Sequence, residues 1–315
     1  MKYINTIQVG DRIKSVYLVN SKIIATARNS KEFASVMLMD KTGSIDSKIW
    51  ELGAPGICEF EVGDYVEAVG QVIEYNKKKQ FKIDSIRVAS PSEYDEADYV
   101  PVTEFNIDDM YAELLGFIDT ISNESIKNLL KLFFVEDETF VAKFKVHTAA
   151  KSVHHGFRGG LLEHTLGVTR ICNFIANTYP FIKKDILVST AMLHDIGKIY
   201  ELSSLPENEY TDSGNLLGHI IMGTMMVRDK IKLIPGFSVA LATEIEHCIL
   251  AHHGKLEYGS PKVPATVEAY ALHLADNYDA KMESFKELFK NNEGDIMWLG
   301  FNKNLDTNVK KSIEI

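Results

Sequence analysis

The spacing of apolar residues changes once along this chain, and that change is the strongest constraint on its fold. Between residues 11 and 89, short segments alternate apolar and polar residues and are separated by turn-forming residues. This pattern predicts five or six strands in a small closed barrel. One predicted turn is Asn20-Ser21, between two of the short strands. Residues 91–106 contain two prolines and a run of acids, and are predicted to be a linker.

Beyond the linker, apolar residues recur at helical spacing, which predicts a bundle of helices. The segments with this spacing are Met110–Ile121, Ser125–Phe134, Leu161–Tyr179, Asp185–Tyr200, Leu217–Ile231, Val239–His252, Pro264–Phe289 and Leu305–Ile313. The predicted fold is therefore a multidomain α+β chain. A β-barrel covers residues 1–90, the acidic linker covers 91–106, and an all-α domain covers 107–315.

Net charge does not exclude nucleic acid as a partner, although the formal value of −10 at first argues against it. Eight acids and no base fall within residues 91–113, so the rest of the chain carries about −2. We therefore expect weak non-specific binding to nucleic acid rather than none.

Cysteine use and hydropathy bear on the cellular compartment. Cys58, Cys172 and Cys248 are odd in number and form no CxxC pair, which predicts buried thiols in a reducing compartment. No apolar run reaches the ~20 residues of a membrane span, and the N-terminal residues lack the apolar core of a secretory signal. We expect a cytoplasmic protein.

The strongest chemical signal is a set of histidines and aspartates on or at the ends of the predicted helices. A helical bundle can project such residues from several helices onto one interior point. Mixed imidazole and carboxylate ligands favour manganese in our interpretation, with Fe²⁺, Ni²⁺, Co²⁺ and Zn²⁺ as further candidates. The candidate ligands are His164, His194, Asp195, His219, His252, His253 and Asp276. Seven ligands are too many for one ion.

The segment His194-Asp195-Ile196-Gly197-Lys198 brings an imidazole, a carboxylate and an ammonium together. On one predicted helix, His194 and Lys198 would share a face, with Asp195 about 100° away. A structural salt bridge between Asp195 and Lys198 would explain this segment equally well if it stood alone. The other histidines and aspartates favour a metal site.

The ordered pattern H…HD…H…HH…D, with the central HDxGK, resembles the HD-domain metal phosphohydrolases. Within that superfamily, the segment from His154 to Thr165, HHGFRGGLLEHT, resembles the YhaM-type 3′→5′ exoribonucleases, as do the N-terminal barrel and the total length. The resemblance covers nearly the whole chain. It implies that His164, His194, Asp195 and Asp276 hold one metal ion.

The same resemblance implies that Asp195 bridges to a second ion, which His219, His252 and His253 complete. Two ions suit phosphodiester hydrolysis, because it needs a nucleophilic hydroxide at neutral pH and a counter-charge for the transition state. We expect three residues to act in catalysis. Lys198 and Arg158 would place their positive charges on phosphate oxygens, and Asp195 would act as the shared metal ligand. A one-ion site made of the first four residues stays open as an alternative.

In the barrel, residues 37–50 resemble the middle hairpin of OB-fold nucleic-acid binders. Such barrels bind single strands by stacking bases on aromatic side chains and by holding phosphates with Lys and Arg. The candidate stacking residues are Phe33, Trp50, Tyr75 and Phe81. The candidate phosphate partners are Arg28, Lys48, Lys77, Lys78 and Lys79. His154 and His155 are further candidates for contact with the scissile phosphate.

The expected function is hydrolysis of single-stranded RNA from its 3′ end to nucleoside 5′-monophosphates, with single-stranded DNA as a further substrate. Polarity and products follow from the resemblance alone. A second hypothesis is an HD-domain phosphohydrolase of nucleotides or cyclic dinucleotides. A third is a non-catalytic RNA-binding protein with a structural metal site. For oligomeric state, the sequence only favours a homo-oligomer over a monomer.

Overall fold

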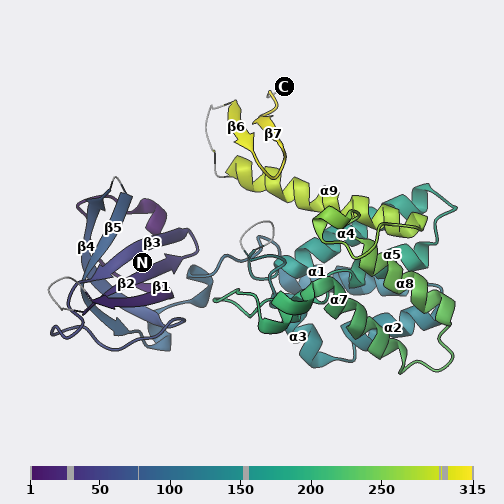
Figure 1. Cartoon of the computed structure of the whole chain (residues 1–315), viewed down its shortest axis with the longest axis horizontal. Coiled ribbons are helices and arrows are strands. Elements are labelled where there is room, and N and C mark those ends of the chain that lie inside the picture. Colours follow the sequence, from purple (N-terminus) through teal and green to yellow (C-terminus); the bar gives the residue numbers. More distant parts are fainter. Residues whose placement is uncertain are drawn as a thin grey trace. The chain divides into compact units, whose positions relative to one another are not determined.

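The computed structural model describes residues 2–26, 32–76, 78–151, 156–290, 292 and 297–313. The chain divides into two compact units (Figure 1). The first comprises Met1–Val102 and Leu205–Glu207, and the second comprises Thr103–Ser204 and Asn208–Ile315. No helix in the described residues is both long and apolar enough to cross a membrane.

The first unit is a closed barrel of five strands in the order β1-β2-β3-β5-β4, an OB-type arrangement in which β3 and β5 are parallel. The strands are β1 (Arg12–Thr26), β2 (Glu32–Asp40), β3 (Gly43–Ile49), β4 (Tyr65–Tyr75) and β5 (Lys78–Val88). Alternate residues point inward, as the period-two pattern predicts, and form an apolar core. The fold class predicted for this half of the chain is confirmed.

Two local predictions for this unit need correction. The turn expected at Asn20-Ser21 is absent, because β1 runs through it and the register of its pairing with β2 shifts between Val19 and Ser21. Such a bulge bends a long strand without ending it. Residues 91–102 of the predicted linker contain two short 3-10 turns, and Tyr94 stacks on Tyr65 with ring centroids 3.9 Å apart.

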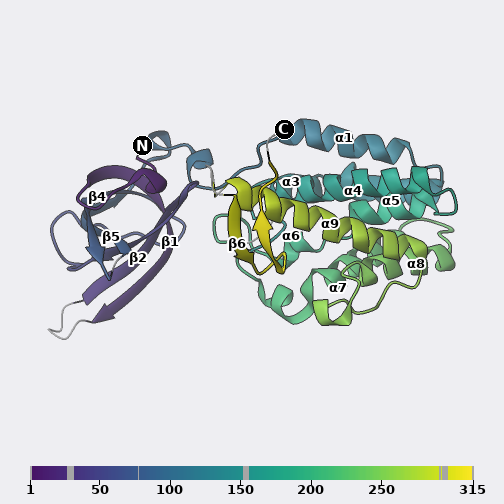
Figure 2. The same cartoon turned by 90° about the horizontal axis from the view of Figure 1, so that it is seen from above.

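The second unit is a helical bundle. Its helices are α1 (Ile107–Asp119), α2 (Glu124–Phe134), α3 (Glu138–Val146), α4 (Gly160–Thr178), α5 (Lys184–Leu193), α6 (Lys198–Glu201), α7 (Asp212–Ile231), α8 (Val239–Ala251) and α9 (Val267–Lys290). Figure 2 shows α4 and α5 between α1 on one side and α7 and α8 on the other. Most of α5 is buried, so this helix forms the centre of the apolar core.

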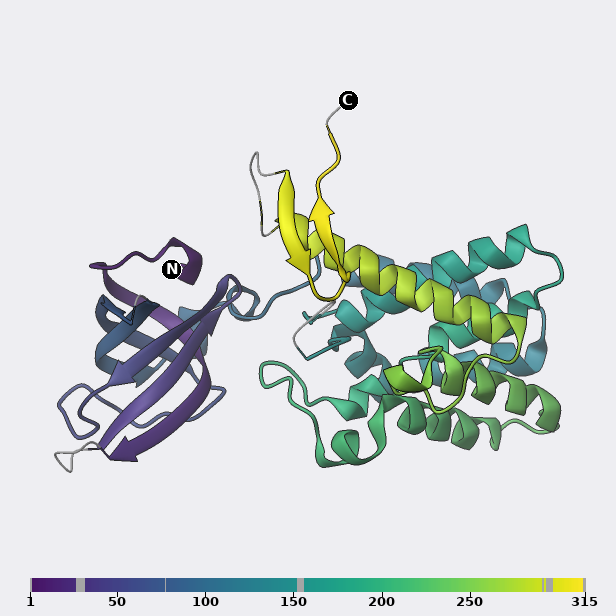
Figure 3. The same cartoon turned by 45° about the horizontal axis from the view of Figure 1, so that its top comes forward.

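The end of the chain differs from its prediction. In place of a helix over Leu305–Ile313, the strands β6 (Trp298–Asn302) and β7 (Thr307–Lys310) form a hairpin beyond the C-terminal end of α9 (Figure 3). The side chain of Asn302 accepts hydrogen bonds from the N–H groups of Asn304 and Leu305, and Asp306 has a φ of 50°. These are features of a tight turn, which ends a helical pattern.

Candidate metal centre

The five histidines that gather in the second unit share one hydrogen-bonding arrangement, which His147 and His273 also show. Each directs Nδ1 to an oxygen acceptor, at distances between 2.7 and 3.0 Å. An imidazole that donates Nδ1–H to such an oxygen keeps its lone pair on Nε2, which is the usual state of a metal-binding histidine. The acceptors are Asp279 for His164, the Ala191 carbonyl for His194, Glu201 for His219, the Ile249 carbonyl for His252 and the Tyr258 carbonyl for His253.

The first group of ligand atoms comes from His164 in α4, His194 at the end of α5 and Asp276 in α9. The Nε2 atoms of His164 and His194 lie 3.2 Å apart, and Asp276 Oδ1 lies 3.2 Å from the first of them. Ligands on one ion at about 2.1 Å lie roughly 3.0–3.5 Å from each other. Two facing lone pairs repel unless a cation lies between them, so this group fits a metal ion.

The second group comes from His219 in α7 and from His252 and His253 at the end of α8. The Nε2 atoms of His219 and His252 lie 3.4 and 3.7 Å from Asp195 Oδ1. All three atoms are buried and have no hydrogen-bond partner among the described residues. An unsatisfied buried polar atom costs about 1–3 kcal/mol, and a cation at their common point would satisfy all three.

Asp195 connects the two groups through its two carboxylate oxygens. Oδ2 lies 3.4 Å from His164 Nε2 and 3.3 Å from His194 Nε2, whereas Oδ1 faces His219 and His252. Each oxygen therefore belongs to a different group. A carboxylate in this position can bridge two ions, which is the geometry that two-metal hydrolytic sites require.

The pKa shifts show that the first ligand group stabilises positive charge, whereas burial and the neighbouring histidines lower the pKa values of His252 and His253. Burial opposes a charge on His164, yet Asp195, Asp276 and Asp279 together raise the pKa of its imidazole well above the ordinary value. Burial likewise opposes ionisation of Asp195, but Lys198 and the histidines hold its pKa well below the ordinary range. A divalent cation satisfies the same carboxylates that otherwise favour a proton on His164.

Two glycines bring His219 to Asp195. A Cβ at Gly197 would lie 2.1 Å from the backbone oxygen of His219, so only glycine permits this close approach of the two segments. Gly218 has a φ of 74° and breaks α7, which leaves the N–H of His219 without a helical acceptor. Glu201 accepts that N–H and also the Nδ1–H of His219, both at 2.9 Å.

The helix predicted over Asp185–Tyr200 is in fact two helices. α5 ends at Leu193 and α6 begins at Lys198, so His194 and Asp195 lie in the turn between them. The hydrogen bond from Lys198 N–H to the carbonyl of Asp195 shows how tight this turn is. The turn directs His194 and Asp195 toward the same point, which residues adjacent on a regular helix would not reach equally well.

The sequence pattern did not identify Asp279 and Glu201 as site residues, although each of them orients one histidine. Asp279 lies three residues after Asp276 on α9, and its Oδ2 is 2.7 Å from His164 Nδ1. The spacing from a ligand on the same helix was the only available signal. A Cβ at Gly167 would lie 2.2 Å from Asp279 Oδ1, so that glycine leaves room for the carboxylate.

The two cations expected to contact phosphate lie in different surroundings. Lys198 Nζ is 2.6 Å from Asp195 Oδ2, and its side chain is mostly buried. Burial lowers the pKa of Lys198, but Asp195 raises it more, so the ammonium stays charged. Arg158 is exposed and has no ion pair with any described residue. His154 and His155 lie outside the described residues.

On the barrel, some of the predicted stacking residues lie at the surface and one lies in the core. Phe33 and Trp50 stack with ring centroids 5.7 Å apart, and Lys48 Nζ lies 5.9 Å from the centre of the Phe33 ring. Tyr75 is exposed and lines a surface pocket of about 500 Å³. Phe81 is only 1% exposed and belongs to the barrel core, so its prediction as a stacking residue is wrong.

The basic candidates of the barrel are also divided. Lys78 is exposed, and Lys79 donates a hydrogen bond to the carbonyl of Ile7. Arg28 and Lys77 lie outside the described residues. Among the cysteines, Cys172 and Cys248 are buried as expected, whereas Cys58 is exposed, which corrects that prediction.

Comparison with known proteins places this centre in a family. The family model described as "HD domain" matches residues 161–281, which contain every ligand of both groups. The chain is 31% identical over 286 residues to the 3′-5′ exoribonuclease YhaM of Listeria innocua, covering 90% of each protein. It is 34% identical over 276 residues to YhaM of Halalkalibacterium halodurans, covering 87% of this chain and 85% of that protein. The chain belongs to the YhaM exoribonuclease family.

Membership of the YhaM family confirms the predicted hydrolase with an HD domain, and it makes the chain a metal-dependent nuclease. Divalent metal binding, as expected of an HD domain, agrees with the His and Asp clusters. A solved structure of the second OB-fold domain of replication protein A from Methanococcus maripaludis is also similar. It has a TM-score of 0.24 and 19% identity, and it covers 28% of this chain and 94% of that one.

Proposed function

We propose that this protein hydrolyses single-stranded RNA from the 3′ end, releases nucleoside 5′-monophosphates and accepts single-stranded DNA as a second substrate. The 3′-5′ exoribonuclease activity in the names of its YhaM relatives supports the substrate and the polarity. We further propose two divalent ions per chain, with manganese as the favoured metal. The mixed imidazole and carboxylate ligands support that choice, because they suit manganese better than magnesium.

The position of Asp195 carries this proposal. One carboxylate oxygen faces His164 and His194, and the other faces His219 and His252. Two bound cations would supply a nucleophile at neutral pH and a counter-charge for the phosphorane-like transition state. A structural metal site would not need histidine nitrogens on both sides of one buried carboxylate.

Lys198 has two roles in the proposed reaction. Its ammonium lies 2.6 Å from Asp195 Oδ2, so it holds this carboxylate in the bridging orientation. Its charge also lies beside the place where a phosphate would meet the ligand groups, and a buried cation there stabilises the growing negative charge of the transition state. Arg158 is exposed, which suits contact with phosphates farther along the strand.

We propose that the barrel holds the RNA strand on the face formed by β2, β3 and the β4–β5 hairpin. The stacked pair Phe33 and Trp50, with Lys48 beside it, offers a flat aromatic surface and a positive charge. Tyr75 and Lys78 line the pocket on the same hairpin. Base stacking on aromatics contributes about 1–3 kcal/mol per base and tolerates any sequence, so we expect little sequence preference.

The test uses a single-stranded RNA labelled at its 5′ end, incubated with the protein and Mn²⁺. A ladder of labelled products that shortens from the 3′ end supports the proposal. Mass spectrometry of the released nucleotides then distinguishes 5′- from 3′-monophosphates. Immediate release of a labelled mononucleotide would show attack from the 5′ end. Intact RNA together with hydrolysis of nucleotides or cyclic dinucleotides would favour the small-substrate phosphohydrolase instead.

Two matched variants connect this activity to the centre. Asp195→Asn should abolish hydrolysis, since one neutral amide cannot replace a carboxylate shared by two ions. Asp229→Asn makes the same chemical change at a side chain that is 70% exposed and pairs with Lys232. The second variant should behave as the unmodified protein. Full activity of Asp195→Asn would refute the assignment of the reaction to this centre.

A further inference from the structure

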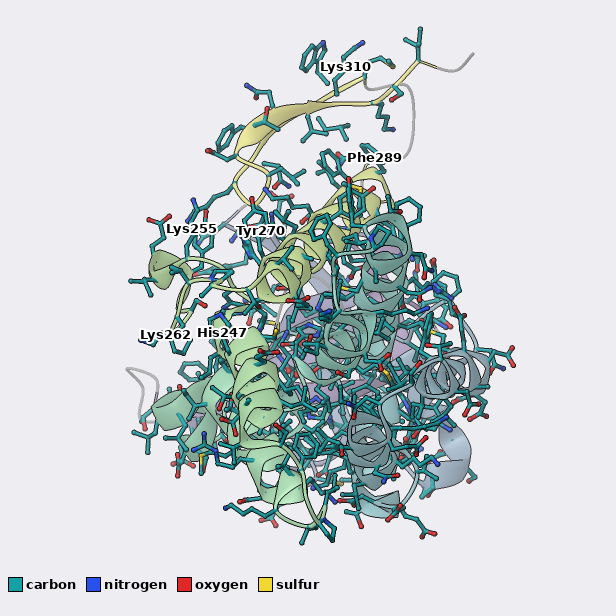
Figure 4. All side chains as sticks on the ribbon, turned by 90° about the vertical axis from the view of Figure 1, so that its right-hand side faces the viewer. His247, Lys255, Lys262, Tyr270, Phe289 and Lys310 are labelled. Carbon is teal, nitrogen blue, oxygen red and sulfur yellow. The ribbon has the colours of Figure 1, made fainter. Side chains whose placement is uncertain are left out.

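The outer face of α9 is apolar, although it is exposed. The structure describes all residues of this helix, and eight of them are exposed. Two of the eight are Asn277 and Lys290, and the other six are large apolar residues. Tyr270 and Phe289 lie toward opposite ends of the helix (Figure 4). The six residues, termed here the α9 stripe, are Val267, Tyr270, Leu274, Tyr278, Met282 and Phe289.

The α9 stripe points away from the metal centre. A helix turns by about 100° per residue, which puts Leu274 and Tyr278 roughly 160° from Asp276 around the axis. Asp276 faces His164 in the interior. Substrate bound at the metal centre is therefore not expected to contact the stripe, and substrate binding does not explain why the stripe is apolar.

Exposure of this kind is unusual for a stable surface. The stripe residues are 39–57% exposed, and contiguous apolar surface of this extent on a soluble protein marks an interaction site. Two cations of α9 are exposed and both are paired with acids: Lys290 at its last position with Glu104, and Lys286, whose side chain is 39% exposed, with Glu163 and Glu283. A surface that binds RNA needs several cations for the phosphates, so the stripe suits a protein partner.

The hairpin beyond α9 adds to the same argument. Within the described residues, β6 and β7 pair only with each other, and a lone two-stranded sheet is marginally stable in water. Trp298 and Phe301 of β6 are more than 60% exposed, whereas Val309 of β7 is buried. Trp298 and Phe301 are therefore the apolar side chains of the hairpin that the described residues leave exposed.

We propose that the α9 stripe and the β6–β7 hairpin form a self-association surface, on which a second copy of this chain docks. The stripe with Trp298 and Phe301 exposes roughly 800 Å², taking about 150–250 Å² for each fully exposed large side chain. A standard interface buries about 800 Å² on each partner. One further copy presenting the same face covers this surface, and no second kind of surface is needed.

The spacing of the stripe fits pairing with itself. Tyr270, Leu274, Tyr278 and Met282 are four residues apart, and such a row forms a ridge along the helix. Two identical ridges can interlock about a two-fold axis, where each residue meets its symmetry-related counterpart or near neighbour. The axis then passes near the middle of the row, close to Asn277.

The test measures the mass of the full-length protein in solution, by light scattering and by sedimentation, across a range of concentrations. The unmodified protein should be a dimer or a multiple of one. The double variant Leu274→Glu with Tyr278→Glu should weaken self-association at least about a hundredfold, because it places four charges in the centre of the interface. The control Leu233→Glu makes the same leucine change at an exposed position after α7 and should leave the mass unchanged.

Crosslinking gives a second measurement that does not depend on a disruptive variant. In a Cys58→Ser background, Asn277→Cys should form an interchain crosslink with a short bis-maleimide, since Cys172 and Cys248 are buried. A monomeric unmodified protein, or a double variant with unchanged mass, would overturn the proposal. So would a double variant that loses RNA affinity at unchanged mass, since the face would then bind nucleic acid. None of these measurements depends on the proposed nuclease activity.

Discussion

Gly197 sets the distance between the two halves of the metal centre, so Gly197→Ala tests how the centre is built. A Cβ at this position would lie 2.1 Å from the carbonyl oxygen of His219 and 2.7 Å from the N–H nitrogen of Gly223. Both neighbours are backbone atoms, which cannot rotate away as a flexible side chain can. The two segments must therefore separate by about 1 Å before the contact reaches even 3.0 Å.

This displacement has two expected costs. Forcing extra volume into a packed interior destabilises a protein by about 1–3 kcal/mol, which for a domain of this size lowers Tm by roughly 3–10 °C. Because His219 moves with its backbone, the second ligand group loses its geometry. A misplacement of about 1 Å at a catalytic group can lower kcat about a hundredfold. The first group contains no residue of α7 and should still bind its ion.

The assay combines thermal unfolding, calorimetric titration with Mn²⁺ and steady-state RNA hydrolysis. Gly116→Ala is the matched control, because nothing lies within 4 Å of a Cβ there and Gly116 is inside α1. That change should stabilise the protein by about 0.5–1 kcal/mol. If Gly197→Ala binds two equivalents of metal with unchanged Tm, the close approach is not what positions His219.

Three further outcomes follow from the same contacts. Asp279→Asn and Glu201→Gln should each lower the affinity for one ion about 10–100-fold, because His164 and His219 lose the carboxylates that orient them. Equilibrium dialysis should show that each variant weakens the binding of a different one of the two metal ions. Trp50→Ala should raise KM for long RNA and leave KM for a dinucleotide unchanged, if the barrel holds the strand. Metal affinity should fall as pH falls, since the carboxylates that outweigh burial raise the pKa of His164 and protons then compete with the ion; a pH-independent affinity would contradict this.

The gathering of the candidate ligands at one place could be predicted, because residue type and order in the sequence indicate it. Histidines on separate helices, with one HD pair and a late aspartate, have few explanations other than a shared interior site. The structure collects them in the same two groups that the resemblance implied. By contrast, Asp279 and Glu201 could not be identified, because a single acid on a helix looks the same whether it orients a histidine or faces solvent.

The alternating pattern of a strand does not show which of its two faces points into the barrel core. Phe33 and Phe81 both lie in alternating segments, but one stacks on Trp50 at the surface and the other fills the barrel core. A shift of one residue exchanges the faces of a strand. The bulge beside Asn20 and the pairing of β6 with β7 also depend on partners distant in the sequence, which local periodicity does not reveal.

The two ligand groups are held by different kinds of structure, and this separates the one-ion and two-ion alternatives that the sequence left open. His164 and Asp276 project from the interiors of α4 and α9, which pack directly on each other. His219 depends instead on the break at Gly218 and on the close approach at Gly197. A protein with Gly197→Ala therefore approximates the one-ion state with every ligand residue still present. Its residual rate of hydrolysis measures what the first ion achieves alone, which removal of any histidine cannot do, because such removal changes the ligands themselves.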